Sequence, residues 1–361
     1  MDSSTSCLDF AAIGHQDGWQ HINAFINGIR TAEMGSLSDE NIKSIFSFIP
    51  PRDLFRVKVR SATGTEINGV YIETFIDPDK LATAFIRTNL NKVTKAISHA
   101  KNMGAKLVTL GGFTSIILEG NIDSFSPDGS AFTTGNTLTA AYIVKGIEKA
   151  ALQHGISLQE CNLLIIGATG DIGMACTHYF KHTIKRLLLC ARNKHRLQKL
   201  SQQLAGENLQ VSYSVTLQDL IPQADVIISV ASSSGILLSN CKKNVLICDA
   251  GYPKNLETKL ENNKDTTLFH GGMGQVSGGY QFFPDYSNTI YKYAAPNIIH
   301  GCILEAMVLA FENKFENYSC GKGNITTENI EEIYRLSVKH GIDVAPFYNA
   351  AGLWKRQPAL I

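Results

Sequence analysis

Between residues 162 and 270 the chain alternates short apolar runs with longer segments of helical spacing. The apolar runs are continuous, which is typical of parallel strands covered on both faces of a sheet. Strands that alternate with helices in this way predict a doubly wound α/β sheet. We expect its strands at Leu163–Ile166, Arg186–Cys190, Gln210–Tyr213, Val226–Val230, Val245–Cys248 and Thr267–His270.

The pattern before this region mixes strand and helix. Two stretches alternate apolar with polar residues and are separated by Thr63-Gly64 and Asn68-Gly69, which predicts a β-hairpin. The first fifty residues carry a weak signal that two helices would explain. The remaining expectations are hairpin strands at residues 55–60 and 70–75, a helix at 78–103, a strand at 106–110, and a helix that follows residues 134–137 and runs to about His154.

Two further helices are expected near the end of the chain, at residues 296–313, with Pro296 in the first turn, and at 327–340. The whole pattern predicts an α/β protein whose centre is a Rossmann-type doubly wound parallel sheet. The expected domains are an N-terminal α/β substrate domain over residues 1–155, a dinucleotide-binding domain over 156–290 and a C-terminal helical segment over 291–361.

A glycine loop follows the first strand of the central domain and opens a helix. Its first glycine permits a tight turn, the second lets the backbone approach a pyrophosphate, and the third lets helix and strand pack closely. The helix N-terminus then offers free amides to phosphates. A glycine-rich turn without a ligand is the alternative. The residues expected to bind the cofactor here are Gly167, Ala168, Thr169, Gly170, Asp171, Ile172 and Gly173.

The second strand ends at Cys190 and is followed by Ala191, Arg192 and Asn193. An NAD-binding domain usually has an acidic residue here that binds the ribose 2′-hydroxyl. Arg192 instead suits a 2′-phosphate, because its planar guanidinium donates two hydrogen bonds. This favours NADPH, with Asn193 nearby, although Arg192 as a plain exposed arginine is the alternative.

Three more loops follow strand ends of the same sheet, where ligands of open parallel sheets bind. They begin at Ala231, Gly251 and Gly271, and they are expected to hold the nicotinamide half. The residues chosen from them are Ala231, Tyr252 and Lys254. Each loop could equally be an ordinary short connection.

Composition excludes several classes of function. The 361 residues are 44% hydrophobic and 18% charged with a net charge of +1, so bulk charge gives no reason to expect nucleic-acid binding. No secretory signal and no apolar stretch of roughly 18 residues is visible, so no membrane segment is expected. The eight cysteines include no CxxC pair. We therefore expect no metal, and a reduced, cytoplasmic protein.

A basic run near the N-terminus is the local exception to this even charge. It consists of Arg52, Arg56, Lys58 and Arg60. The run is interpreted either as a solvated strand edge that charge protects from pairing, or as a docking patch for an acidic partner.

Several segments resemble the long-chain acyl-[acyl-carrier-protein] reductases of the cyanobacterial type, which make fatty aldehydes. The resemblance covers roughly residues 57–340, whereas residues 273–293 and the extreme N-terminus depart from the family pattern. The matching segments are Leu110–Ile117, Phe132–Thr137, the glycine loop, Ala191–Asn193, Gly251–Leu256 and the late helix with Cys302, Glu305-Ala306-Met307 and Phe311-Glu312.

The resemblance implies an NADPH-dependent reduction of an acyl thioester through an acyl-cysteine, with Cys302 as the nucleophile. It implies acyl-carrier protein or acyl-CoA as the acyl donor, and an aldehyde-consuming enzyme as a further possible partner. The floor of the acyl site would then include Gly112, Phe113, Ser115, Asn136 and Thr137. Domain packing around tight turns is the alternative for these five residues.

Taken from the residues alone, Cys302 is ambiguous. It shares a helix face with Ala306 and Leu309, which is typical of an inert core cysteine. A helix that begins at Pro296 would place it beyond the first turn, where the dipole has faded. Glu305 would raise the thiol pKa, so no activator is identified. Cys320, in a turn, is the next candidate.

Other functions remain open. A substrate domain before a Rossmann domain also fits an oxidoreductase similar to shikimate dehydrogenase or glutamyl-tRNA reductase. A non-catalytic NADPH-binding protein is the third possibility.

Overall fold

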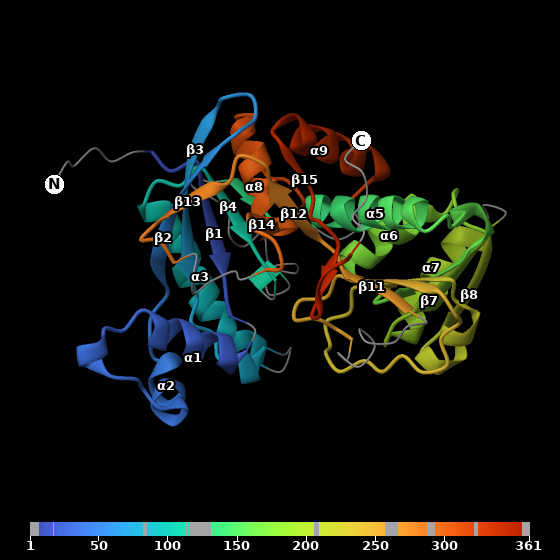
Figure 1. Cartoon of the computed structure of the whole chain (residues 1–361), viewed down its shortest axis with the longest axis horizontal. Coiled ribbons are helices and arrows are strands. Elements are labelled where there is room, and N and C mark those ends of the chain that lie inside the picture. Colours follow the sequence, from blue (N-terminus) through green and yellow to red (C-terminus); the bar gives the residue numbers. More distant parts are fainter. Residues whose placement is uncertain are drawn as a thin grey trace. The chain divides into compact units, whose positions relative to one another are not determined.

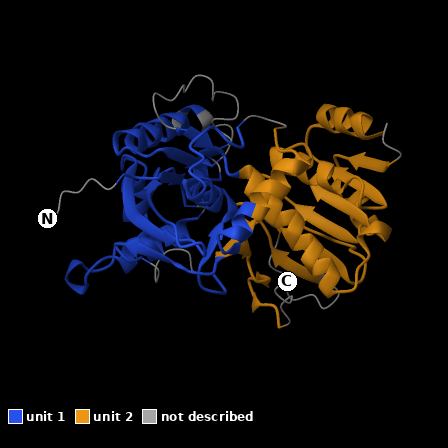
Figure 2. Ribbon diagram, turned by 90° about the horizontal axis from the view of Figure 1, so that it is seen from above, with its two compact units in different colours: residues 1–135, 276–321, 336–342 blue, residues 136–275, 322–335, 343–361 orange. Residues whose placement is uncertain are grey.

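The computed structural model forms two compact units (Figure 2), and each is described by itself. The first unit contains Met1–Gly135, Val276–Gly321 and Leu336–Ile342, and the second contains Asn136–Gln275, Lys322–Arg335 and Asp343–Ile361. The residues that the structure describes are 7–16, 18–81, 85–112, 114–115, 131–205, 209–256, 266–286, 293–320 and 324–355.

A six-stranded parallel sheet forms the core of the second unit, in the order β11-β10-β9-β6-β7-β8. Counted from β6, this is the Rossmann order, and the direction of winding reverses between β6 and β9. The strands are β6 (Asn162–Ile166), β7 (Arg186–Cys190), β8 (Gln210–Ser214), β9 (Val226–Ser229), β10 (Val245–Asp249) and β11 (Thr266–His270). The predicted fold class is confirmed, and every predicted strand of this sheet is present within one residue at each end.

Helices of the second unit pack against this sheet and against one another (Figure 1). α5 (Asn136–Gln153) contacts α6 (Asp171–Phe180) and β10, and α7 (Lys194–Ala205) contacts β8. Twelve residues of α5 are buried, which explains its nearly continuous apolar sequence. A short hairpin of β16 (Tyr348–Asn349) and β17 (Gly352–Leu353) completes the regular structure that lies wholly in this unit.

The first unit contains a mixed six-stranded sheet in the order β13-β2-β3-β1-β4-β5. Strands β3, β1, β4 and β5 run parallel to one another, while β2 and β13 are antiparallel additions. The strands are β1 (Phe10–Gly14), β2 (Arg52–Arg60), β3 (Glu66–Glu73), β4 (Leu107–Leu110), β5 (Ala131–Thr133) and β13 (Tyr280–Phe283). The helices are α1 (Trp19–Gly28), α2 (Asp39–Phe46), α3 (Ile86–Asn102) and α8 (Gly301–Phe311), and β14 (Ile298–His300) directly precedes α8.

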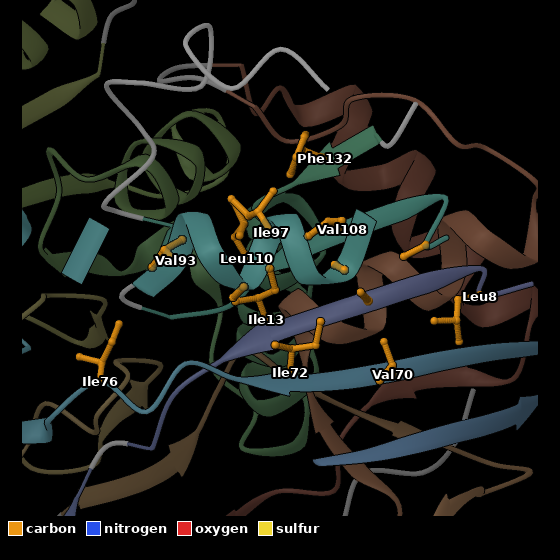
Figure 3. Close-up of a cluster of buried hydrophobic side chains, with 14 residues drawn as sticks. Leu8, Ile13, Val70, Ile72, Ile76, Val93, Ile97, Val108, Leu110 and Phe132 are labelled. Carbon is orange, nitrogen blue, oxygen red and sulfur yellow. The ribbon is translucent and has the colours of Figure 1, made fainter. Parts of the chain in front are cut away.

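Helices α3 and α8 lie on opposite faces of this sheet. Alternate strand residues such as Ile13, Ile72 and Leu110 are buried against Val93 and Ile97 of α3 (Figure 3). Helix α8 contacts β1, β3 and β4. The carboxyl ends of β3, β1 and β4 therefore lie at one edge of the sheet, beside the start of α8.

Three elements run across the boundary between the units along the chain: β12 (Met273–Val276), α9 (Thr327–Lys339) and β15 (Ile342–Val344). The short 3₁₀ segments are Ala32–Met34, Pro78–Lys80, Leu158–Glu160, Leu217–Asp219 and Ile221–Gln223. Within the described residues, no helix is long and apolar enough to cross a membrane, and no cluster of His, Cys, Asp and Glu side chains is suited to a metal ion.

The units differ from the expected domain ranges at three places. The expected C-terminal segment 291–361 is not a separate unit, because Lys322–Arg335 and Asp343–Ile361 belong to the second unit and Leu336–Ile342 to the first. Helix α5 lies in the second unit and not with residues 1–135, because its apolar face packs against α6 and β10. Residues 276–321 belong to the first unit, where β13 pairs with β2 and α8 covers the sheet. The unit to which each segment belongs depends on contacts with segments far away in the chain. A local sequence pattern does not predict such contacts.

The predicted hairpin is confirmed as β2 and β3, but Asn68-Gly69 lies inside β3 and not in the turn. A side-chain carbon at Gly69 would lie 2.2 Å from the Phe10 ring, so this glycine makes room for a neighbouring aromatic ring. The interpretation of Arg52–Arg60 as an edge strand is wrong, because β2 pairs with β3 on one side and with β13 on the other.

Candidate functional site

Cys302 lies in the first turn of α8, whose N-cap residue is His300. The expected helix start at Pro296 is wrong, because Asn297 has φ +61° and residues 298–300 are extended in β14. The thiol is therefore placed where a helix dipole favours a thiolate, and not beyond its reach as the sequence suggested.

Two glycines allow α8 to begin against the ends of β4 and β5. A side-chain carbon at Gly135 would lie 2.1 Å from the Cys302 Cα, and one at Gly111 would lie 3.3 Å from its Sγ. Gly135 also has φ +71°. From β4, the Thr109 hydroxyl donates a 2.8 Å hydrogen bond to the Cys302 carbonyl. Gly111 belongs to Leu110–Ile117 and Gly135 to Phe132–Thr137. Two of the segments that carry the family resemblance therefore lie beside this cysteine.

The groups around Cys302 have opposite effects on the pKa of its thiol. Burial raises the pKa of the Cys302 thiol to about 11, and the negative charge of Glu305 also raises this pKa. Hydrogen bonds from the backbone amides of Ile303, Gly112 and Cys302 itself lower it. Near neutral pH the group is therefore a thiol, and attack on an electrophile requires a proton acceptor.

Glu305 stabilises the turn after β5, which contains Gly135 and lies against Cys302. This carboxylate is fully buried and accepts a hydrogen bond from the Thr133 hydroxyl. The Thr133 oxygen in turn accepts a 3.2 Å hydrogen bond from the Gly135 amide. Because a buried charge needs such partners, the three groups fix the end of β5 against α8.

The residues predicted to form the substrate site fall into two groups. The Gly112 amide faces the Cys302 sulfur, and the Ser115 hydroxyl closes the same turn by a 2.8 Å hydrogen bond to the Gly112 carbonyl. Asn136 and Thr137 belong to the second unit, where the Asn136 amide donates a 3.0 Å hydrogen bond to Asp171. Phe113 lies outside the described residues.

An apolar pocket lies between α8 and the sheet of the first unit, beside the turn that carries Cys302. No polar surface lines it. Ile303 and Met307 of α8 form one wall, and the other lining residues are Phe10, Ala12, Phe55, Val57, Val70, Tyr71, Phe282 and Ile299. Such a lining suits a hydrocarbon and offers nothing to a charged ligand.

The glycine loop of the second unit has the geometry that a pyrophosphate requires. Gly167 has φ +91°, and a side-chain carbon there would lie 2.7 Å from the Val230 carbonyl. A side-chain carbon at Gly173 would lie 2.2 Å from the Gly167 oxygen, so helix and strand pack as closely as the motif predicts. No side chain caps α6 at Gly170, which leaves its first amides available to a phosphate. The residues present therefore fit a dinucleotide.

Arg192 lies after β7, at the position for the adenosine ribose. Its guanidinium donates a 3.0 Å hydrogen bond to the Ser232 hydroxyl, and both residues are on the surface. The Asn193 side chain accepts a 3.0 Å hydrogen bond from the Arg196 amide and so caps α7. Asn193 therefore positions the helix that follows Arg192.

Asn255 and Asp249 organise the neighbouring strand-end loops, although neither was selected from the sequence as a site residue. The Asn255 amide group accepts a 2.9 Å hydrogen bond from the Ala231 amide and donates to the Ala231 and Ser233 carbonyls. The Asp249 carboxylate accepts from the Gly251, Asn255 and Leu256 amides. Both are buried polar side chains in a glycine- and proline-containing loop, and this is the signal that could have identified them.

The remaining predicted cofactor residues lie in the same loop as this pair. Lys254 donates a 3.2 Å hydrogen bond to the Asp249 carbonyl, and Tyr252 precedes a cis proline in the same loop.

Cys320 lies in the first unit. Its thiol donates a 3.3 Å hydrogen bond to the Phe132 carbonyl, and burial raises the pKa of this thiol to about 11. Unlike Cys302, Cys320 does not lie in the first turn of a helix, so it is the weaker candidate nucleophile.

A family model and several known proteins match this chain. The family model for shikimate / quinate 5-dehydrogenase matches residues 148–270. The long-chain acyl-[acyl-carrier-protein] reductase of Synechococcus elongatus is 36% identical over 311 residues, which cover 82% of this chain and 88% of that protein. The glutamyl-tRNA reductase of Pasteurella multocida is 32% identical over 35% of this chain and 31% of its own length.

Solved structures are more distant. The glutamyl-tRNA reductase of Methanopyrus kandleri is 19% identical, with a TM-score of 0.29 over 51% of this chain and 47% of its own. The similarity to a reductase over 82% of this chain implies a nicotinamide cofactor.

Proposed function

Because this chain belongs to the family of long-chain acyl-[acyl-carrier-protein] reductases, we propose that it reduces a long-chain acyl thioester to a fatty aldehyde. NADPH is the hydride donor, and Cys302 is the nucleophile. The observation that carries this proposal is a cysteine in the first turn of α8, with an entirely apolar pocket lined by Ile303 and Met307 of the same helix.

The chemistry follows from these two features. The Cys302 sulfur attacks the thioester carbonyl and expels the carrier thiol, and the acyl chain points toward the apolar pocket. The Gly112 amide, which faces the sulfur, is placed to donate to the oxygen that becomes negative in this step. When bound, the cofactor supplies the hydride that reduces the acyl-cysteine. Release of the aldehyde regenerates the thiol.

Acyl-carrier protein is the proposed acyl donor, since the relative that covers 82% of this chain carries it in its name. Acyl-CoA would present the same thioester, and the two differ in the surface that must be recognised. An enzyme that consumes the aldehyde is a further proposed partner.

The proposal is tested by incubating the protein with a long-chain acyl thioester in the absence of NADPH and locating any acyl adduct by peptide mass spectrometry. We expect one adduct, on Cys302, which added NADPH removes as free aldehyde. The absence of any adduct, or an adduct confined to Cys320, would contradict the proposed mechanism.

Arg192 is proposed to select NADPH over NADH. A charge-assisted hydrogen bond contributes about 1.5–3 kcal/mol, so Arg192→Ala should raise the KM for NADPH by roughly 10- to 150-fold and leave that for NADH unchanged. Arg196→Ala is the matched control, since Arg196 is exposed on the same helix start. Equal changes for the two cofactors would show that Arg192 does not recognise the 2′-phosphate.

A further inference from the structure

A buried carboxyl group and a tyrosine lie at the sheet edge that carries Cys302, and the mechanism above does not use them. Glu73 is the last residue of β3 and is 2% exposed. Its Oε2 accepts hydrogen bonds from the Tyr71 hydroxyl at 3.0 Å and from the Gln16 amide at 3.1 Å. The Phe75 amide donates to Oε1 at 3.1 Å. Burial of a carboxyl group costs free energy, and these hydrogen bonds offset part of that cost.

Tyr71 lies on the α8 face of the sheet, because its ring lines the same apolar pocket as Ile303 and Met307. Its hydroxyl occupies space above Gly14, where a side-chain carbon would lie 2.7 Å from it. The Cys302 sulfur lies in the same way above Gly111, 3.3 Å from the place of a side-chain carbon.

Gly14 and Gly111 are neighbours across two strands. They directly follow Ile13 and Leu110, which pair in parallel register, and the Gly111 amide donates to the Ile13 carbonyl at 3.0 Å. Adjacent strands are about 4.8 Å apart, so the hydroxyl and the thiol lie over neighbouring positions at the end of the sheet. Since both residues are glycine, neither position carries a side chain that could stand between the two groups.

We propose that Tyr71 and Glu73 form the proton acceptor for Cys302 in the acylation step, with the Tyr71 hydroxyl as the relay. This inference rests on the proposed function, in which Cys302 attacks a thioester. It supplies the acceptor that a protonated thiol requires and that α8 itself does not provide.

The step balances in protons and bonds. As the Cys302 sulfur bonds to the thioester carbonyl carbon, its proton passes, directly or through one water, to the Tyr71 oxygen, and the Tyr71 proton passes to the Glu73 carboxylate. The bond between the carbonyl carbon and the carrier sulfur then breaks. The proton returns by the same route to this sulfur, which leaves as a thiol, and nothing is oxidised or reduced.

The charges around Glu73 suit this task. Burial raises the pKa of Glu73 to about 7, against the hydrogen bonds from Gln16, Phe75 and Tyr71 and the positive charge of Lys92 on α3. Burial lowers the pKa of Lys92 to about 8, and its ammonium group donates to the Phe75 carbonyl. A general base is most effective when its pKa is close to the working pH.

The test measures the rate of Cys302 acylation by a long-chain acyl thioester without NADPH, between pH 5.5 and 9. In the wild-type protein we expect the rate to rise with pH and to be half-maximal near pH 7, where Glu73 loses its proton. Cys302 itself, with a pKa near 11, would give no inflection in this range. Glu73→Gln should lower the rate at pH 8 by roughly 10²- to 10³-fold and abolish the inflection.

Two matched variants control for lost hydrogen bonds. Glu312→Gln removes another carboxylate of the first unit, which pairs with His340 and Lys339, and Tyr142→Phe removes another buried hydroxyl. Both should keep the wild-type rate and pH profile. A folded Glu73→Gln variant with the wild-type pH profile would overturn the proposal.

If Glu73→Gln fails to fold, Tyr71→Phe decides the question. It keeps the ring in the pocket and should still lower the rate at pH 8 by at least about tenfold. An unchanged rate in Tyr71→Phe would overturn the relay. If wild-type Cys302 is never acylated, the proposed function itself fails, and this outcome is distinct from a failure of Tyr71 and Glu73.

Discussion

Replacement of Cys302 by alanine is expected to abolish aldehyde formation, with a loss of roughly 10³-fold or more in kcat, because removal of a nucleophile leaves only binding and electrostatic contributions. The fold should survive. The side chain is partly exposed, and the close contacts that place the first turn of α8 are made by its backbone with Gly135 and Thr109.

Steady-state aldehyde production and NADPH binding by fluorescence titration together check this expectation. The variant should bind NADPH with wild-type affinity, because the glycine loop and Arg192 belong to the second unit. Cys320→Ala is the control and should keep activity. If the Cys302→Ala variant retains more than about a tenth of wild-type activity, the acyl-cysteine mechanism is wrong, and a direct hydride transfer to the thioester would replace it.

Gly135→Ala should have the second largest effect, and it should act through structure. A side-chain carbon at this position would lie 2.1 Å from the Cys302 Cα and 2.6 Å from its carbonyl oxygen, and both are backbone atoms that cannot rotate away. Left-handed backbone strain of about 1–2 kcal/mol adds to overpacking of about 1–3 kcal/mol. We therefore expect the free energy of unfolding to fall by roughly 2–5 kcal/mol. The folded fraction should lose activity by about a hundredfold, since α8 must move.

Gly104→Ala separates these two causes. Gly104 has φ +79° and nothing within 4 Å of the added carbon, so this variant carries the backbone strain alone. It should lower the free energy of unfolding by about 1–2 kcal/mol and leave kcat unchanged. Urea unfolding followed by circular dichroism, with kcat measured on the same preparations, gives both quantities. Equal effects of the two substitutions would mean that α8 tolerates displacement.

The cofactor loop was predictable because its requirements are local. A tight turn, a close approach of backbone to phosphate and a helix N-terminus are all specified by glycines at 167, 170 and 173 directly after an apolar strand. Arg192 is one strand further along and follows the same local logic. The resemblance to acyl-carrier-protein reductases rested on several such short segments, and the comparison confirms it.

The environment of Cys302 was not predictable in this way. Apolar periodicity continues from Pro296 through Phe311, and it does not reveal that Asn297 is left-handed and that the next three residues form a strand. Moving the helix start to Gly301 reverses the expectation about the dipole. Likewise, Tyr71 and Glu73 look like ordinary strand residues until Gly14 and Gly111 are found as neighbours on paired strands.

The sequence by itself determined the Rossmann sheet and predicted the dinucleotide loop, because periodicity and glycine spacing are properties of short segments, whereas Cys302 was singled out only by the family resemblance. Only the tertiary structure decided which segments pack together: α5 with the second unit, residues 276–321 with the first, and Cys302 beside Gly111 and Gly135. Such contacts join residues about two hundred positions apart, as between Thr109 and Cys302. The burial that results, and not the composition of the chain, raises the pKa values of Glu73 and Cys302 on which the proposed chemistry depends.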